Sequence, residues 1–406
     1  MAESGPISVT VVCCGAPKRG MGWYHCKQLL DGRVDGAKLT DVVEPWFLGG
    51  GKDSPPAKEF AEWAEANPSV KYHASLDDVP ETSTPRLVII CGRTADNPRL
   101  FKAAVDKGFS HIYLEKPGAP TTAELEEMSG YASSKGRGVF MGYNRNFSKY
   151  IKDANMEMAK APAGCSLTLG RNDCFNTPEA VDECFERNAE GMLKNMMVHE
   201  LVTLITYHGL TVDKIASIEA DASKTKLETR RGFTDFSQVG FTIAMSSGQK
   251  FILWGDRSNG EYGEAVVKNE DGEEVFKAVR PDDEISAKSK ELEEALPGCM
   301  PYFYLQDGEY LALKAAVISS IASGSGERPT GVAGIDTAIE SVKLCDHILA
   351  ALMAAVQGDV EEAEEEVVMK KPAAAKAKAK GKGRPKGKAK SKAVAKDIKK
   401  KPAARK

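Results

Sequence analysis

Residues 7–25 decide the fold of the N-terminal part of this chain; they read Ile-Ser-Val-Thr-Val-Val-Cys-Cys-Gly-Ala-Pro-Lys-Arg-Gly-Met-Gly-Trp-Tyr-His. The apolar run over residues 7–14 predicts a buried strand, and residues 21–30 predict the helix that follows it. The turn between them carries Gly15, Gly20 and Gly22. Glycines in such a turn allow a tight bend, a bare backbone beside a pyrophosphate and close packing of helix on strand. Pro17 interrupts the usual G-x-G-x-x-G spacing, so an ordinary tight turn remains the alternative interpretation.

Short apolar runs and helical stretches keep alternating to about residue 145. Strands are expected at residues 39–44, 70–72, 86–91, 111–114 and 138–141, and helices at residues 56–66, 97–107 and 121–134. Repeated β-α-β units predict a parallel, doubly wound sheet of the Rossmann type. We place this α/β domain, with nucleotide binding as its expected task, at residues 1–147.

The chain is long enough for a second cored domain, because it has 406 residues of which 42% are hydrophobic. We place that domain at residues 148–357. Its expected strands are residues 166–169, 215–220, 238–245, 250–254, 263–269 and 274–278, and two helical stretches, residues 306–323 and 335–355, are expected to close it. No apolar run reaches 18 residues and the N-terminus is not signal-like, so we expect a cytoplasmic protein without a membrane segment.

The nine cysteines are scattered, without a C-x-x-C pair or a histidine at zinc-site spacing. The expected metal content is therefore none. Cys13 and Cys14 are interpreted as small hydrophobic residues inside the first strand.

Residues 358–406 differ in composition from the rest of the chain. An acidic run, residues 359–366, precedes a Lys/Ala-rich tail, and residues 370–406 hold 17 Lys or Arg and one acid. Their net charge of +16 leaves −19 for residues 1–369, because the whole chain carries −3. We expect a disordered basic tail. Its Gly-Arg-Pro core around Arg384 resembles that of an AT-hook, and the sequence leaves two interpretations open: non-specific nucleic acid binding, with a nuclear location, or a merely solubilising or localising extension.

The second expected strand ends at Glu44, where Rossmann domains hydrogen-bond the adenosine ribose of the dinucleotide. A carboxylate there repels a 2′-phosphate, which favours NAD over NADP. Arg19 and Lys18 in the glycine turn could serve a phosphate and keep NADP open.

Lys116 follows the buried strand 111–114 within the sequence Glu115-Lys116-Pro117. A surface charge is the simplest interpretation of a lone lysine. Its place just beyond a buried strand favours a catalytic task, since an ammonium there can hydrogen-bond a reacting oxygen.

Four motifs together resemble the Gfo/Idh/MocA family, the glucose-fructose oxidoreductase and inositol dehydrogenase group. They are Gly20-Met-Gly-Trp-Tyr-His25, Val43-Glu44-Pro45, Glu115-Lys116-Pro117 and Gly142-Tyr-Asn-Arg-Asn-Phe147, and the likeness covers about residues 7–355. The resemblance implies a Rossmann domain followed by an α/β domain with a large, mostly antiparallel sheet. It also implies an NAD(P)-dependent oxidoreductase that acts on CH–OH groups of a sugar, polyol or related small molecule, and a homo-oligomer.

The resemblance also implies a catalytic set of Lys116, Asn195 and His199. His199 would be the general base that takes the hydroxyl proton as hydride leaves the same carbon. Asn195 stands where many relatives carry an aspartate, and Val202 replaces a further acid, whereas Glu200 could supply a carboxylate from another direction. These departures keep open a second class of function, a catalytically inactive NAD(P)-binding redox sensor that reaches nucleic acid through its tail.

Further cofactor contacts follow from the same resemblance. Thr94, Asn97 and Glu115 are expected on the nicotinamide side, together with Gly15, Arg19, Gly20, Gly22 and Glu44 at the other end. Arg171-Asn-Asp173 and Tyr302-Phe-Tyr304 are candidate substrate contacts without a motif of their own, and His208 is interpreted as a structural residue at a helix end.

Overall fold

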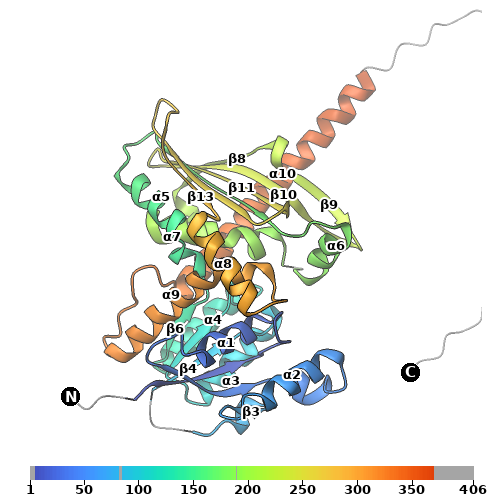
Figure 1. Ribbon diagram of the computed structural model, residues 1–406. Coiled ribbons are helices and arrows are strands. Elements are labelled where there is room, and N and C mark those ends of the chain that lie inside the picture. The colour runs from blue at the N-terminus through green and yellow to red at the C-terminus, as the bar shows by residue number, and fades with distance from the viewer. Residues whose placement is uncertain (1–4, 82–84, 189, 370–406) are drawn as a thin grey trace, which may run out of the picture. The chain divides into compact units, whose positions relative to one another are not determined.

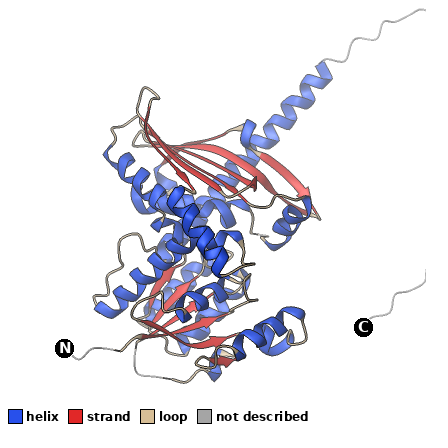
Figure 2. Cartoon of the chain, viewed as in Figure 1, coloured by secondary structure: helices blue, strands red, loops and turns tan. Residues whose placement is uncertain are grey.

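The computed structural model describes residues 5–81, 85–188 and 190–369, with side chains as far as residue 356. Its contacts separate residues 1–359 from residues 360–406, and the first unit contains both β-sheets. Figure 1 shows the two sheets in succession along the chain, and Figure 2 shows helices covering them.

The first sheet confirms the predicted Rossmann fold. Its strands are β1 (Ile7–Val12), β2 (Ala37–Val43), β3 (Lys71–His73), β4 (Arg86–Ile90), β5 (His111–Leu114) and β6 (Gly138–Met141). All pairs are parallel, in the order β3-β2-β1-β4-β5-β6. The connecting helices are α1 (Met21–Leu30), α2 (Pro55–Glu65), α3 (Asn97–Asp106) and α4 (Thr122–Ser134). The strand order reverses between β1 and β4, and ligands of such sheets bind outside the carboxyl ends of the strands at this point.

The second sheet is mixed and mostly antiparallel, as expected. It contains β7 (Ser166–Asp173), β8 (Ile215–Ala220), β10 (Phe233–Met245), β11 (Lys250–Asn259), β12 (Tyr262–Lys268) and β13 (Glu274–Arg280), and β9 (Lys226–Arg230) pairs with β10. The one parallel pair joins β7 to β11. Alternate residues of β11 are buried, the period of two that packs one face of a sheet.

Several elements of this half were missing from the sequence-based expectation. They are β9, α5 (Lys149–Lys160), α6 (Pro178–Arg187) and α8 (Asp283–Ala295). These helices are rich in charged residues and carry few apolar ones, so no apolar run marks them in the sequence. Next to them lies α7 (Val198–His208), which begins directly after a π-helical turn, Leu193–Met197.

The long helix α9 (Pro301–Ser323) corrects one expectation, because it packs on the first sheet and not on the second. Its Phe303, Leu313 and Val317 share a core with Val9 and Val11 of β1. The ring of Tyr24 in α1 stacks on Phe303 with 4.3 Å between centroids, and its hydroxyl donates to Asp307 Oδ1 at 2.6 Å. Helix α9, although it follows the second sheet in the sequence, therefore completes the core of the Rossmann domain.

The helix α10 (Ile335–Met369) runs beyond the predicted end at residue 355 and includes the acidic run. The basic tail with its expected nucleic acid contacts, residues 370–406, lies outside the described residues. None of the helices in the described part of the chain combines the length and the apolar character that a membrane crossing requires.

Candidate active site

The glycine turn after β1 brings helix α1 very close to the strand. A Cβ atom at Gly20 would lie 2.6 Å from the carbonyl oxygen of Cys14, and one at Gly22 would lie 2.5 Å from that of Cys13. Helix α1 can pack this closely on β1 only because both positions lack side chains. No side chain caps the helix at Gly20 in the described residues, and the amide of Trp23 donates to the carbonyl oxygen of Cys14 at 2.6 Å, so the amides of Met21 and Gly22 are the first-turn donors left for an anion.

The end of β1 differs from the sequence interpretation. The strand stops at Val12, and Cys13 adopts a left-handed conformation with φ of 61°. A non-glycine residue there costs about 1–2 kcal/mol. Cys13 is therefore part of the turn and not of the strand, while Cys14 is fully buried as expected.

Glu44 directly follows β2 and supports the glycine turn. Its Oε2 accepts the amide of Gly15 at 2.8 Å, and its Oε1 accepts the amide of Trp46 at 3.2 Å. Each carboxylate oxygen keeps a second lone pair for a ribose hydroxyl. Arg19 is half-exposed and pairs with Glu59 of α2 at 2.8 Å, so its guanidinium lies at the surface of the turn.

Thr94 and Asn97 follow β4 on the same edge of the sheet. Thr94 begins a short 3-10 turn, and Asn97 is the first residue of α3. The buried amide of Asn97 donates to the carbonyl oxygen of Gly118 at 3.0 Å, which ties this loop to the loop after Lys116. Neither residue lines the cavity described next.

A cavity of about 640 Å³ opens beside the carboxyl edge of the first sheet and is also lined by residues of the second-sheet half. It brings together Lys116, Asn195, His199 and Glu115, four of the residues predicted from the sequence. Met21, Cys91 and Gly92, from the ends of the nucleotide-binding strands and helices, line it as well. The predicted glycines Gly15, Gly20 and Gly22, with Arg19 and Glu44, are not among its lining residues.

Lys116 joins the two halves of this cavity. Its Nζ donates to the backbone carbonyl oxygen of Asn195 at 2.7 Å. Burial lowers the pKa of Lys116 from its ordinary value, because an ammonium loses hydration in the cavity wall, while Glu190 and Glu115 oppose that shift. The ammonium is held in place and can present its other N–H groups to a substrate oxygen.

His199 lies in the first turn of α7 and is 7% exposed. Its Nδ1 has no hydrogen-bond partner among the described residues. Burial first, and then the charges of Lys116, Arg145, Arg171 and Arg280, lower the pKa of His199 well below its ordinary value. The imidazole is therefore neutral at pH 7, which is the form that a general base requires.

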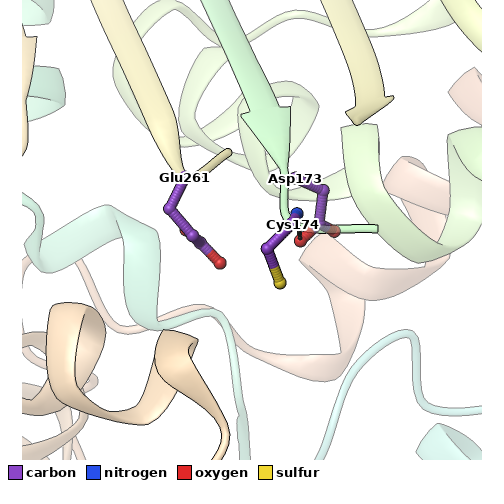
Figure 3. A group of neighbouring side chains, drawn as sticks. All are labelled: Asp173, Cys174 and Glu261. Atoms are coloured by element: carbon purple, nitrogen blue, oxygen red, sulfur yellow. Dashed lines mark hydrogen bonds between the residues drawn. The ribbon is translucent and has the colours of Figure 1, made fainter. Parts of the chain in front are cut away.

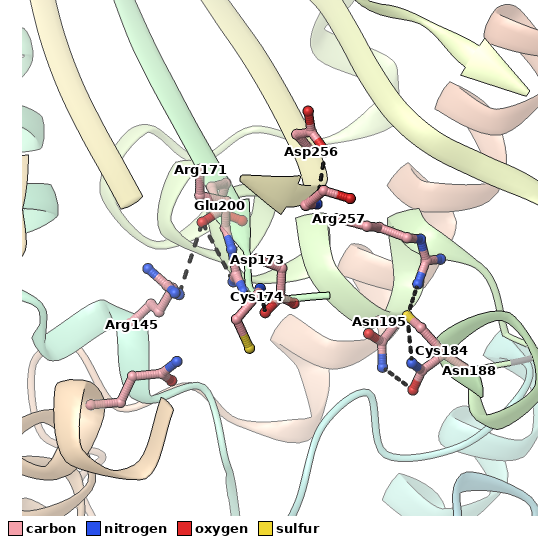
Figure 4. Close-up of polar contacts among 12 residues, drawn as sticks. Arg145, Arg171, Asp173, Cys174, Cys184, Asn188, Asn195, Glu200, Asp256 and Arg257 are labelled. Carbon is pink, nitrogen blue, oxygen red and sulfur yellow. Dashed lines mark hydrogen bonds and ion pairs between the residues drawn. The ribbon is translucent and has the colours of Figure 1, made fainter. Parts of the chain in front are cut away.

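Asn195 does not orient His199 in this structure. It lies in the π-helical turn, and its side-chain amide donates to Asn188 Oδ1 at 2.9 Å. Asn188 in turn donates to Cys184 Sγ, which also accepts from the buried Arg257, as Figure 4 shows. The contribution of Asn195 to the cavity is its backbone carbonyl, which no sequence motif specifies.

Glu115 is engaged by a buried histidine. Its Oε1 lies 2.9 Å from His25 Nε2, and Lys314 Nζ of α9 lies 2.9 Å from His25 Nδ1. A carboxylate only accepts, so Nε2 carries the proton and Nδ1 accepts from Lys314. This series of hydrogen bonds, from Lys314 through His25 to Glu115, fixes the carboxylate of the residue directly before Lys116. His25 belonged to a sequence motif, whereas Lys314 had no signal in the sequence.

Asp173, Cys174 and Glu261 project into the cavity from the turn regions of the second sheet (Figure 3). One ligand atom from each lies within 4.8 Å of the others. Arg171 Nη2 is 3.7 Å from Asp173 Oδ2, so the carboxylate of Asp173 already faces the guanidinium of Arg171. We assign this group no metal, and interpret its oxygens as partners for substrate hydroxyls.

The remaining predictions for this region have mixed outcomes. Glu200 is 1% exposed and faces Arg145 and Arg171 at 4.0 Å, behind the cavity. Tyr302 lines the cavity as expected. His208 is structural, but it bonds Asn155 Oδ1 at 2.8 Å and not the carbonyls of the helix end. Glu261 was missed, because only the β11–β12 turn brings it here.

Comparisons with known proteins agree with this fold. Residues 21–143 match the Gfo/Idh/MocA family model, described as an oxidoreductase family with an NAD-binding Rossmann fold. Myo-inositol dehydrogenase from Corynebacterium glutamicum is 17% identical with a TM-score of 0.63, and the match covers 86% of this chain and 97% of that one. Scyllo-inositol dehydrogenase from Lactobacillus casei, with bound NAD(H) and scyllo-inositol, is 15% identical with a TM-score of 0.64 over 85% and 96%. No curated protein matches the chain in sequence.

The fold, with an N-terminal Rossmann domain and a second mixed sheet, is that of these solved dehydrogenases. The resemblance seen in the sequence is thereby confirmed, and the chain carries the NAD-binding domain of the Gfo/Idh/MocA family.

Proposed function

We propose that this protein is an NAD-dependent dehydrogenase that oxidises a CH–OH group of a small hydroxylated molecule, or reduces the corresponding carbonyl. The observation that supports it best is that Lys116 and His199 line one cavity next to the carboxyl edge of the Rossmann sheet. Lys116 and His199 are 83 positions apart in the sequence, and the fold brings them to one site.

The cofactor would be held by the glycine turn and Glu44, and it supplies the hydride acceptor when bound. The carboxylate of Glu44 supports NAD over NADP, since a 2′-phosphate would meet a like charge. Arg19 is paired with Glu59 at the surface, which weakens the case for a phosphate contact from that side chain.

The protein's own residues account for the proton transfer. Neutral His199 accepts the hydroxyl proton, and the ammonium of Lys116 hydrogen-bonds the same oxygen as it gains negative charge. Burial, and then the cations around His199, lower its pKa and keep the imidazole unprotonated before the reaction. The backbone carbonyl of Asn195 limits where the Lys116 ammonium can lie. Asn195 thus contributes to catalysis through its main chain.

The test is nicotinamide absorbance during incubation of the full chain with NAD or NADP and a panel of sugars, polyols and hydroxy acids, beside Lys116→Ala. Turnover that the substitution abolishes supports the dehydrogenase. Cofactor binding without turnover on any substrate would favour the second candidate, an inactive redox sensor, and failure to bind either cofactor would rule out both. The homo-oligomer stays a prediction, which sedimentation of the same sample checks.

A further inference from the structure

Arg171 is a buried cation with unused hydrogen-bonding capacity. It lies in β7, lines the cavity and has a side chain that is 7% exposed. Its guanidinium carries five N–H donors, yet the nearest carboxylate oxygens are 3.7 Å away on Asp173 and 4.0 Å away on Glu200. The Nε atom has no partner among the described residues. Buried donors left in this state are costly, and an acceptor placed in the cavity beside the guanidinium would lower that cost.

Two further guanidiniums lie behind Arg171. Arg145 Nε is 4.0 Å from Glu200 Oε1, and Arg280 Nε is 3.7 Å from Glu309 Oε1. Both Nε atoms also lack hydrogen-bond partners in the described part of the chain. Figure 4 shows Arg145 and Arg171 directed at Glu200 from different elements. The three guanidiniums therefore face three carboxylates, Asp173, Glu200 and Glu309, at 3.7 to 4.0 Å, which is beyond hydrogen-bond distance.

Two acidic side chains that line the cavity near Arg171 are Asp173 and Glu261. Asp173 is already opposite Arg171. Burial, and then the charge of Asp173, raise the pKa of Glu261, which favours its neutral form. Besides burial, the charges of Lys116, Arg145, Arg171 and Arg280 lower the pKa of His199. An anion is thus better suited to this end of the cavity than a neutral group.

We propose that Arg171 binds a carboxylate of the substrate, so that the preferred substrate is a hydroxylated carboxylate, such as a sugar acid or a hydroxy acid, and not a neutral polyol. The planar guanidinium matches a carboxylate with two parallel hydrogen bonds. Asp173 and Glu261 then serve the hydroxyl groups between that carboxylate and the carbon at His199. The proposal rests on the proposed function, whose substrate class it specifies.

Equilibrium binding of D-glucuronate and D-glucose to the full chain saturated with NADH tests the proposal without turnover. The two probes differ by a carboxylate in place of a hydroxymethyl group. We expect glucuronate to bind at least about tenfold more tightly, the value of one charge-assisted hydrogen bond. Equal binding, tighter binding of glucose, or binding of neither probe would overturn the proposal. So would tighter binding of glucose 6-phosphate than of glucuronate, since that result assigns the site to phosphate.

Substitutions locate the effect. Arg171→Gln is expected to weaken glucuronate binding about 10- to 100-fold and to leave glucose binding unchanged. Arg171→Lys keeps the charge and the fold but loses the paired geometry, so the glucuronate preference should fall several-fold without disappearing. An unchanged preference in Arg171→Lys, or equal weakening of both probes in Arg171→Gln, contradicts the assignment.

Arg230→Gln is the matched control. Arg230 belongs to β9 of the same sheet, pairs with Glu228 and Asp182, and does not line the cavity. Its loss removes one positive charge and should leave the glucuronate preference as it is. A protein that shows this preference but reduces NAD with no substrate would contradict the proposed dehydrogenase alone, which keeps the two failures distinguishable.

Discussion

The ammonium of Lys116 and the backbone carbonyl of Asn195 meet at 2.7 Å, although one residue follows a strand of the first sheet and the other lies in a π-helical turn before α7. This contact holds the side chain of Lys116 against the part of the chain that also carries His199. Because the acceptor is a main-chain atom, the position of the lysine depends on the local backbone and not on the side chain at residue 195.

Lys116→Ala should lower kcat/KM by about 10²- to 10⁴-fold, the range of a group that assists proton transfer. NAD binding should change little, since the glycine turn and Glu44 lie outside the cavity lining. Steady-state kinetics and cofactor titration of the same samples check both statements. Lys107→Ala, an equal truncation at the end of α3, should match the wild type; a similar loss there would contradict the assignment.

Asn195→Ala should lower kcat/KM by at most about tenfold, the worth of one neutral hydrogen bond, because the carbonyl that holds Lys116 is retained. Asn188→Ala removes the same amide contact from the other side and should have a similar effect. The double variant should then be no worse than either single one. A loss of 10³-fold in Asn195→Ala would show instead that its side chain takes part in the chemistry.

The pH dependence of kcat should reflect the depressed pKa of His199. A base must be unprotonated, so activity should persist as the pH falls through 6.5 and decline only at lower pH. Arg171 is one of the cations that lower this pKa, so Arg171→Gln should move the acidic limb to higher pH. A limb at or above pH 6.5 in the wild type would be incompatible with a base in this environment.

Gly22→Ala should destabilise the fold by about 1–3 kcal/mol, because its Cβ would lie 2.5 Å from the Cys13 carbonyl oxygen and push α1 from β1. Cofactor binding should weaken with it. Gly130→Ala in α4 is the matched control, since a Cβ there meets nothing within 4 Å, and it should stabilise by about 0.5–1 kcal/mol. Denaturant unfolding measures both, and equal stability of the two variants would contradict the packing argument.

Acid should destabilise the protein through His25. Burial, and then Lys314, lower the pKa of His25 from 6.5 to about 4, against the opposing effect of Glu115. The unfolded chain binds a proton near pH 6.5 while the folded chain does not, so stability falls by roughly 3 kcal/mol between pH 6.5 and 4.

Burial also lowers the pKa of His208 to about 4, so this residue adds to the loss of stability between pH 6.5 and 4. Lys314→Met removes the cation beside His25, raises its pKa and should make the acid loss shallower. The measurement is the free energy of unfolding at several pH values for both proteins. An identical slope would show that Lys314 does not control the titration of His25.

The Rossmann half was predictable because its information is local. Apolar runs such as residues 111–114 and the glycines of residues 15–22 specify strands and a turn wherever they occur, and a regular β-α-β succession leaves few topologies. The second half was harder. Helix α9 was assigned to the wrong sheet because its apolar residues show that it is buried, but not against which partner.

The sequence by itself determined the fold class, the glycine turn, and the identities of Lys116 and His199 as candidates. Only the tertiary structure decided that Lys116 is held by a main-chain carbonyl, that Lys314 reaches His25, and that Arg171 and Glu261 face the same cavity. The physical reason is range. Periodicity and turn chemistry act within a few residues, whereas the charges that set the site converge from strands and helices far apart in the chain, and their energies exist only once those elements pack.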